Sequence, residues 1–182
     1  MDVPTRQTHR IELNLRDVSG LFNSMDPSPF HERDLDHDAE EFIISWAQEY
    51  PVADPIELLV HLEHWPADDP TELIRAGVRH YFTYRARLDL LEFRRLMQQG
   101  RTSLVIGLVF LAVCLAASSL LQVYQAQAWA GLIRESLTIA GWVAMWRPMQ
   151  LYLYDWWPIR RRWRITSKLS RVNVIVSHKP PH

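Results

Sequence analysis

The feature that most constrains this chain of 182 residues is an uninterrupted run of 32 residues without a charged side chain, residues 102–133. Its first part, residues 103–121, is almost entirely apolar. At about 1.5 Å per residue, a helix of that length spans roughly 28 Å, close to the hydrocarbon thickness of a bilayer. The segment starts far from the N-terminus, so it is not a secretory signal peptide. The pattern predicts a transmembrane helix over residues 102–123.

A second apolar stretch follows a short extracytoplasmic turn predicted at residues 124–130, and it covers residues 131–154. Arg147 falls inside this stretch. Depending on the register, its side chain lies at the bilayer midplane or at the cytoplasmic surface, and we favour an intermediate depth from which it reaches the inner headgroups. Pro148 cannot donate a backbone hydrogen bond, so it is expected to kink the helix or to open a new one. Together the two stretches predict a transmembrane helical hairpin.

The near-zero net charge of −1 conceals a strongly uneven distribution. Residues 1–72 carry a net charge of −13, residues 73–101 carry +5, residues 102–157 are neutral and residues 158–182 carry +7. Because basic residues concentrate on the cytoplasmic side of membrane proteins, both termini are predicted to be cytoplasmic in a multi-pass protein of a bacterial inner membrane. The single cysteine excludes a disulfide scaffold.

The acidic first segment, residues 1–68, has the pattern of a small α/β head. Apolar residues alternate at residues 10–15 and 55–63, which predicts two strands, and a helical stripe lies between them from Asp38 to about Tyr50. Two parallel strands are too few for a stable sheet. We therefore predict that a C-terminal strand at residues 171–177 returns to the head as its third member; the alternative is a tail that lies free.

A strong helix start stands at Asp69, where an N-cap residue is followed by Pro70 and Glu72. Helical spacing of apolar residues then continues through a basic juxtamembrane segment, residues 69–101, which we call the neck. The helix is expected to run without a break from Thr71 into the first span, with Gly100 as its weakest point. The fold class is therefore an α/β membrane protein: a cytoplasmic head with a three-stranded sheet and helices, plus a transmembrane helical hairpin.

Residues near the inner end of the second span are the candidate functional positions, because amphipathic rings and cations collect at membrane interfaces. These candidates are Arg147, Pro148, Asp155, Trp156, Trp157, Arg160, Arg161 and Arg162. The run from Arg160 to Arg164 has a basic and aromatic mix that also suits nucleic acid. The same mix is expected just inside a membrane, so we predict the bilayer and its anionic inner-leaflet lipids as partners, and no nucleic acid.

Motifs for catalysis are missing from the sequence. There is no phosphate-binding glycine loop, no GxGxxG, no HExxH and no GxSxG turn. Two polar clusters could supply metal ligands, one with His31, Asp34, Asp36 and His37 and the other with His61, Glu63 and His64. An acidic loop before a helix and a half-exposed strand face explain them more simply. We predict no catalytic residue, no metal site and no cofactor.

Four segments carry a resemblance: residues 28–35 (SPFHERDL), 38–43 (DAEEFI), 141–148 (GWVAMWRP) and 153–158 (LYDWWP). They are similar to segments of a family of uncharacterised small bacterial inner-membrane proteins with two spans. The resemblance implies a two-span topology and a bacterial origin. It implies no activity, cofactor or catalytic residue.

Three functions from different classes are compatible with these patterns. The first is a non-enzymatic inner-membrane protein whose head binds a protein partner or another copy of the chain, forming a homo-oligomer. The second is an oligomeric pore or transporter component that uses Arg147 to select anions. The third is a metal-dependent membrane hydrolase using one of the two histidine clusters. The absence of catalytic motifs favours the first.

Overall fold

The computed structural model describes residues 8–27, 29, 33–124 and 127–179. They fall into two compact units. The sheet unit contains the chain up to Leu90 and again from Arg161 onward, and the helical unit is Leu91–Arg160. The sheet unit is therefore built from both ends of the chain, with the helical unit inserted between them.

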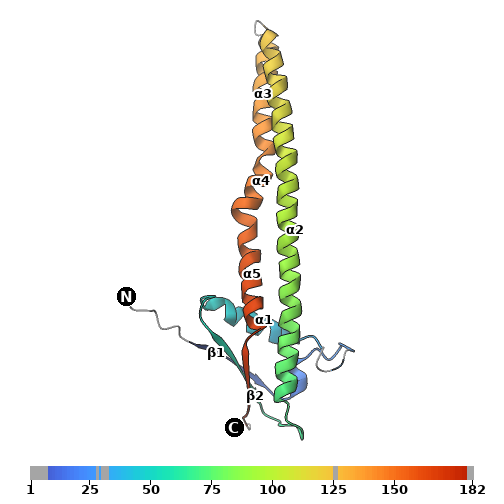
Figure 1. Ribbon diagram of the computed structural model, residues 1–182, viewed down its shortest axis with the longest axis vertical. Helices are drawn as coiled ribbons and strands as arrows, with labels where there is room; N and C mark the ends of the chain where they lie inside the picture. Colours follow the sequence, from blue (N-terminus) through green and yellow to red (C-terminus); the bar gives the residue numbers. More distant parts are fainter. Residues whose placement is uncertain (1–7, 28, 30–32, 125–126, 180–182) are drawn as a thin grey trace, which may run out of the picture. The chain divides into compact units, whose positions relative to one another are not determined.

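The elements follow one another along the chain as shown in Figure 1. They are β1 (His9–Leu15), a 3-10 turn (Val18–Leu21), α1 (His37–Glu49), β2 (Ile56–Leu62), α2 (Thr71–Leu120), a second 3-10 turn (Leu121–Tyr124), α3 (Ala128–Ala144), α4 (Trp146–Gln150), a π-helical turn (Leu151–Asp155), α5 (Trp156–Leu169) and β3 (Asn173–His178).

A three-stranded parallel sheet forms the base of the sheet unit, in the order β1-β2-β3. Leu58 at the middle of β2 pairs with Ile11 of β1 and with Val174 of β3. The predicted third strand is thus confirmed, and it pairs with β2 rather than lying free. The two strands predicted at residues 10–15 and 55–63 are also present. Strand β1 begins one residue earlier than predicted, and β2 is one residue shorter at each end.

The core of the sheet unit lies on one face of this sheet. Residues that share a face through the strand register are buried in all three strands, among them Ile11, Leu58 and Val174. Helices α1, α2 and α5 cover that face with the buried side chains Ala39, Ile43, Ala47, Ile74, Val78, Tyr81, Phe82, Ile165 and Leu169. Burial of this apolar surface is the main force that holds the two separate parts of the chain together.

The opposite face of the sheet is mostly polar, although Leu59 and Ile175 also lie on it, and side-chain pairs join neighbouring strands there. The Arg10 guanidinium lies 3.6 Å from the Glu57 carboxylate, and the Asn173 amide donates to Glu57 at 3.4 Å. These pairs explain how a parallel sheet, usually covered on both faces, tolerates an uncovered one.

Both predicted helix starts in the sheet unit have carboxylate caps. The Asp36 side chain accepts the Asp38 N–H at 3.0 Å and caps α1. At α2, Asp69 accepts from the Thr71 hydroxyl at 2.6 Å and from the Thr71 N–H at 3.0 Å. These hydrogen bonds lower the pKa of Asp69, because they stabilise its charged form.

Helix α2 runs for 50 residues without interruption and passes Gly100, as the sequence predicts. Within the described residues, this is the one helix that is long and apolar enough to cross a membrane. Its most apolar window of 18 residues has a mean hydropathy of 2.7, and only 17% of that window is buried. The first twenty residues of α2 belong to the sheet unit and the rest to the helical unit.

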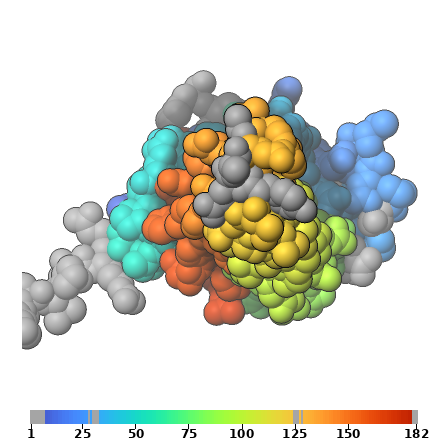
Figure 2. Space-filling model, turned by 90° about the horizontal axis from the view of Figure 1, so that it is seen from above, coloured from blue at the N-terminus to red at the C-terminus, as the bar shows by residue number. Residues whose placement is uncertain are grey.

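The second apolar stretch is divided into several pieces in the helical unit. Helix α3 ends at Ala144, α4 begins at Trp146, and a π-helical turn, Leu151–Asp155, leads into α5. The sequence patterns did not predict α5, because its many arginines mask the helical spacing of Ile165 and Leu169. In the space-filling view the side chains of α2 and α3 lie directly against each other (Figure 2).

Candidate functional site

Pro148 stands where the second apolar stretch breaks. A proline at this position has no N–H to donate to the carbonyl of Ala144, four residues earlier, and α3 ends at that residue. The Ala144 carbonyl oxygen instead faces Gly107 of α2, only 3.2 Å from where a β-carbon would stand. Of the two outcomes predicted for Pro148, a kinked helix or a new helix, the structure shows a new helix, α4.

Arg147 and Asp155, two further candidates, approach each other in the helical unit. The Arg147 Nη1 atom lies 4.0 Å from the Asp155 Oδ2 atom, and their side chains are 56% and 31% exposed. The π-helical turn that ends at Asp155 separates them along the chain. At this distance and exposure the pair partly neutralises the two charges but adds little stability.

The aromatic and basic candidates at the start of α5 contact each other. The rings of Trp156 and Trp157 lie 5.4 Å apart, and the Arg160 guanidinium lies 5.4 Å from the Trp156 ring, a cation–π distance. The Trp156 indole N–H donates to the Tyr152 carbonyl at 2.8 Å. Trp157 is 65% exposed. The cluster thus presents apolar rings and one cation together, the composition expected where a helix leaves a bilayer.

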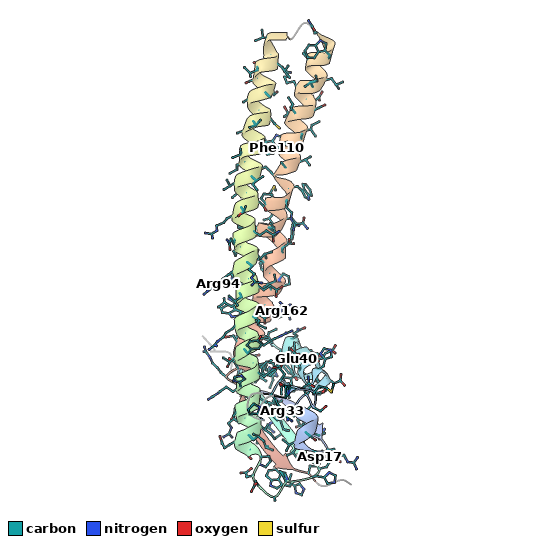
Figure 3. The ribbon with its side chains drawn as sticks, turned by 90° about the vertical axis from the view of Figure 1, so that its right-hand side faces the viewer. Asp17, Arg33, Glu40, Arg94, Phe110 and Arg162 are labelled. Atoms are coloured by element: carbon teal, nitrogen blue, oxygen red, sulfur yellow. The ribbon has the colours of Figure 1, made fainter. Side chains whose placement is uncertain are left out.

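The two remaining candidates belong to the sheet unit and anchor α5 there. Arg161 donates to the backbone carbonyl of Gln48, at the end of α1, at 2.9 Å. Arg162 donates its Nε–H to the Asp89 carboxylate, also at 2.9 Å. Figure 3 labels Arg162 on α5 and Glu40 on α1, both in this unit. The sequence candidates therefore fall in both units, Arg161 and Arg162 in the sheet unit and the other six in the helical unit.

Asp89 is the residue that sequence reasoning missed. It is 3% exposed, yet it lies on a predicted basic neck. Its second oxygen accepts the Thr166 hydroxyl at 2.8 Å, so both carboxylate oxygens are satisfied from α5. A buried carboxylate is costly unless it is paired in this way. The signal in the sequence is the i, i+4 spacing of Arg162 and Thr166, which places both on one helix face.

A second polar group lies beside a pocket of about 310 Å³ between α1, α2 and α5. Glu40 of α1 lies 3.3 Å from the Arg85 guanidinium of α2. Burial, and then the nearby Glu40 carboxylate, raise the pKa of Tyr81 well above its ordinary value. The raised pKa keeps the Tyr81 phenol protonated, as a hydrogen-bond donor beside Glu40. The group therefore joins α1 to α2 within the sheet unit.

The two histidine clusters are not assembled into metal sites in the part of the chain that is described. His31 of the first cluster lies outside the described residues. In the second, His61 lies 3.8 Å from Glu12, whereas His64 lies 3.2 Å from Asp17. Among described residues, no group of three potential ligands is close enough to hold a metal ion.

Comparisons of this chain with protein-family models, with curated proteins and with solved structures found no match. The class of protein therefore follows from its own fold. It is an α/β protein with a three-stranded parallel sheet whose strands come from both ends of the chain. Between them, the described part of the chain carries one helix long and apolar enough to cross a membrane.

Proposed function

We propose that the chain is an integral protein of a bacterial inner membrane whose helical unit forms a two-span hairpin. The observation that carries this proposal is the exposed apolar surface of α2. Side chains such as Val105, Ile106 and Val109 are 60%, 64% and 59% exposed in the absence of lipid. Exposing apolar surface to water costs roughly 25 cal/mol per Å², so a surface of this extent favours lipid as its surroundings.

Helix α3 is proposed as the second span. Its 17 residues would cover roughly 26 Å, slightly less than a typical hydrocarbon core. It packs on α2 through Gly141, and its large apolar residues Leu132, Trp142 and Val143 are more than 60% exposed. The break at Pro148 and the pair of Arg147 with Asp155 then fall at the inner interface, which agrees with an Arg147 side chain that reaches the headgroups.

Orientation follows from the basic residues on both sides of the proposed hairpin. By the positive-inside rule they support a cytoplasmic position for the neck and the C-terminal segment, and hence for both termini and the sheet unit. Anionic lipids of the inner leaflet attract these basic segments, at about 1 kcal/mol per residue near the surface.

For the sheet unit we infer a non-enzymatic role: it binds a protein partner or a second copy of the chain. The support is that Asp89 and Glu40, two carboxylates of the unit, pair with residues of its own helices. Crosslinking in native membranes tests this role. A reproducible homo-oligomer or partner is expected, and a chain that stays monomeric without any partner would contradict it.

The membrane topology has its own test. In a chain with Cys114 replaced by Ala, single cysteines are introduced at Ser19, Gln127 and Lys179. In intact spheroplasts, whose inner membrane is sealed, an impermeant maleimide is expected to label Gln127→Cys alone. The other two cysteines should be labelled only after lysis. Release of the chain by alkaline carbonate, or labelling of Ser19→Cys in intact spheroplasts, would overturn the proposal.

A further inference from the structure

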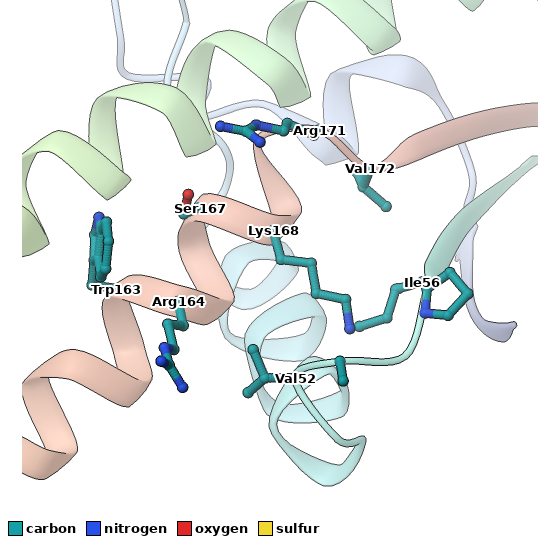
Figure 4. A pocket seen from close by; sticks show the side chains of 10 residues that line it. Val52, Ile56, Trp163, Arg164, Ser167, Lys168, Arg171 and Val172 are labelled. Carbon is teal, nitrogen blue, oxygen red and sulfur yellow. The ribbon is translucent and has the colours of Figure 1, made fainter. Parts of the chain in front are cut away.

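A second pocket of the sheet unit, of about 580 Å³, is lined by residues to which no role has been given above. It lies between α5 and the segment that joins α1 to β2, at the amino ends of β2 and β3 (Figure 4). Its walls are Val52, Ala53, Pro55, Ile56, Trp163, Arg164, Ser167, Lys168, Arg171 and Val172.

The pocket is lined by three cations and by no carboxylate. Arg164, Lys168 and Arg171 follow at i, i+4 and i+7 along α5 and the turn after it, and their head groups leave that segment in different directions around the pocket (Figure 4). Among the described residues, Arg164 and Arg171 have no carboxylate within ion-pair distance. The carbonyl end of α5 favours a cation at Lys168, but that effect is confined to the last turn and does not account for Arg164.

Lys168 is the most constrained of the three cations. Its side chain extends from α5 toward segment 52–56 (Figure 4), and its ammonium group donates to the neutral Pro51 carbonyl at 3.4 Å. Burial lowers the pKa of Lys168, and the charge of Asp54 opposes that effect only in part. Asp54 itself lies 3.2 Å from the His9 ring nitrogen. An anion in the pocket would therefore stabilise the charged form of Lys168.

We propose that this pocket binds the phosphate group of a small phosphate ester, held by Arg164, Lys168 and Arg171. Guanidinium groups bind phosphate oxygens in pairs, and the Ser167 hydroxyl adds a neutral donor. The volume exceeds that of a bare phosphate and falls in the range of small-molecule sites. The apolar side of the pocket, formed by Val52, Ile56 and Val172 among others, suits the organic part of the ester.

Two sources could supply this chemistry, a soluble phosphate ester or the headgroup of an anionic phospholipid. For the soluble source, glycerol 3-phosphate is titrated into the full chain in an uncharged detergent, followed by calorimetry, with glycerol as the control ligand. For the lipid source, native mass spectrometry counts the phosphatidylglycerol that the chain retains in competition with phosphatidylcholine. The second arm rests on the proposed membrane location, whereas the first does not.

The variants Arg164→Gln and Lys168→Gln are each expected to weaken binding in the responsive arm by about tenfold or more, since each removes a charge-assisted contact. Arg16→Gln is the matched control, because it removes one exposed cation from the same unit outside the pocket. Carbonate extraction and thermal unfolding of all three variants should match the unmodified chain. These two measurements separate loss of the site from loss of membrane insertion or folding.

Binding in either arm that depends on Arg164 and Lys168 supports the site and identifies its source. The proposal is overturned if neither probe binds saturably. It is equally overturned if Arg16→Gln lowers binding as much as the pocket variants, since binding would then report net charge alone.

Discussion

At the scale of single residues, the sheet unit depends on polar groups that are buried with their partners. Asp89 is the clearest, because α5 satisfies both of its oxygens through Arg162 and Thr166. Tyr81 is the second, since it is 7% exposed and lies near the charged Glu40. Such groups stabilise one arrangement of the helices and penalise others, because any arrangement that leaves them unpaired pays the cost of desolvation.

The substitution Asp89→Asn tests this pairing. It keeps the shape of the side chain but removes the charge that Arg162 faces. We expect a loss of roughly 1–2 kcal/mol in the free energy of unfolding, at the lower end for a charged hydrogen bond because the Arg162 side chain is 43% exposed. Denaturant unfolding of the full chain in detergent measures the loss. Asp68→Asn, at an exposed position, should change nothing, and equal stabilities of the two variants would contradict the pairing.

Tyr81 predicts a specific response to alkaline pH. The pKa of its phenol is raised in the folded state, so above about pH 10 the unfolded chain releases this proton while the folded chain keeps it. The contribution of Tyr81 to stability is therefore present below pH 10 and is lost as the pH rises further, by at most about 1.4 kcal/mol per pH unit. The free energy of unfolding of Tyr81→Phe should fall less steeply over pH 10–11.5 than that of the unmodified chain. Parallel curves would refute the effect.

At the scale of elements, the packing of α3 on α2 depends on a close approach at Gly141. A β-carbon there would stand 2.9 Å from Leu111 Cδ1 and 3.2 Å from Cys114 Cβ, so only glycine fits without displacement. Small residues allow helices in lipid to approach in this way. Gly131 on the same helix is the contrast, since a β-carbon there meets nothing within 4 Å.

Replacement of Gly141 by Leu is expected to separate α3 from α2 and to destabilise the helical unit by about 1–3 kcal/mol, the usual cost of overpacking. The fraction of sodium dodecyl sulfate needed to unfold half of the chain reports this loss. Gly131→Leu adds the same side chain to the same helix and should leave the midpoint unchanged. A similar loss in both variants would mean that the added side chain itself, rather than the contact at Gly141, is responsible.

At the scale of the whole molecule, the sheet joins residues from the two ends of the chain. Adjacent residues of β3 have opposite environments: Val174 is 1% exposed in the core and Ile175 is 37% exposed on the other face. Strand β2, which carries the centre of the core, has β3 as one of its two neighbours. The stability of the first part of the chain should therefore depend on a strand that comes about 110 residues later.

We expect Val174→Ala to lower the free energy of unfolding by about 2 kcal/mol and to speed hydrogen exchange at the β2 amides of Leu58 and Val60. Ile175→Ala removes a larger side chain but should cost less than about 1 kcal/mol, because the position is partly exposed. Burial rather than size then decides the result. If Ile175→Ala were the more harmful variant, β3 would not pack as described.

The local patterns of this sequence were sufficient for most of its elements. Alternating apolar residues predicted the three strands, Asp69 with Pro70 predicted the start of α2, and Pro148 predicted a break in the second apolar stretch. Helix α5 was not predicted, because its spacing becomes visible only when Ile165 and Leu169 are known to face a core. Asp89, likewise, looks like one acid among many bases until its partners on α5 are placed against it.

By itself, the sequence determined the apolar run of α2, the uneven charge and the periodicity of each strand, because these depend on neighbouring residues. The tertiary structure decided that β3 pairs with β2, that Asp89 is buried against α5, and that Arg164, Lys168 and Arg171 line one pocket. Those features depend on contacts between residues far apart in the chain. Local spacing does not encode such contacts, since they form only where burial of a shared core offsets the entropy lost in bringing the two ends together.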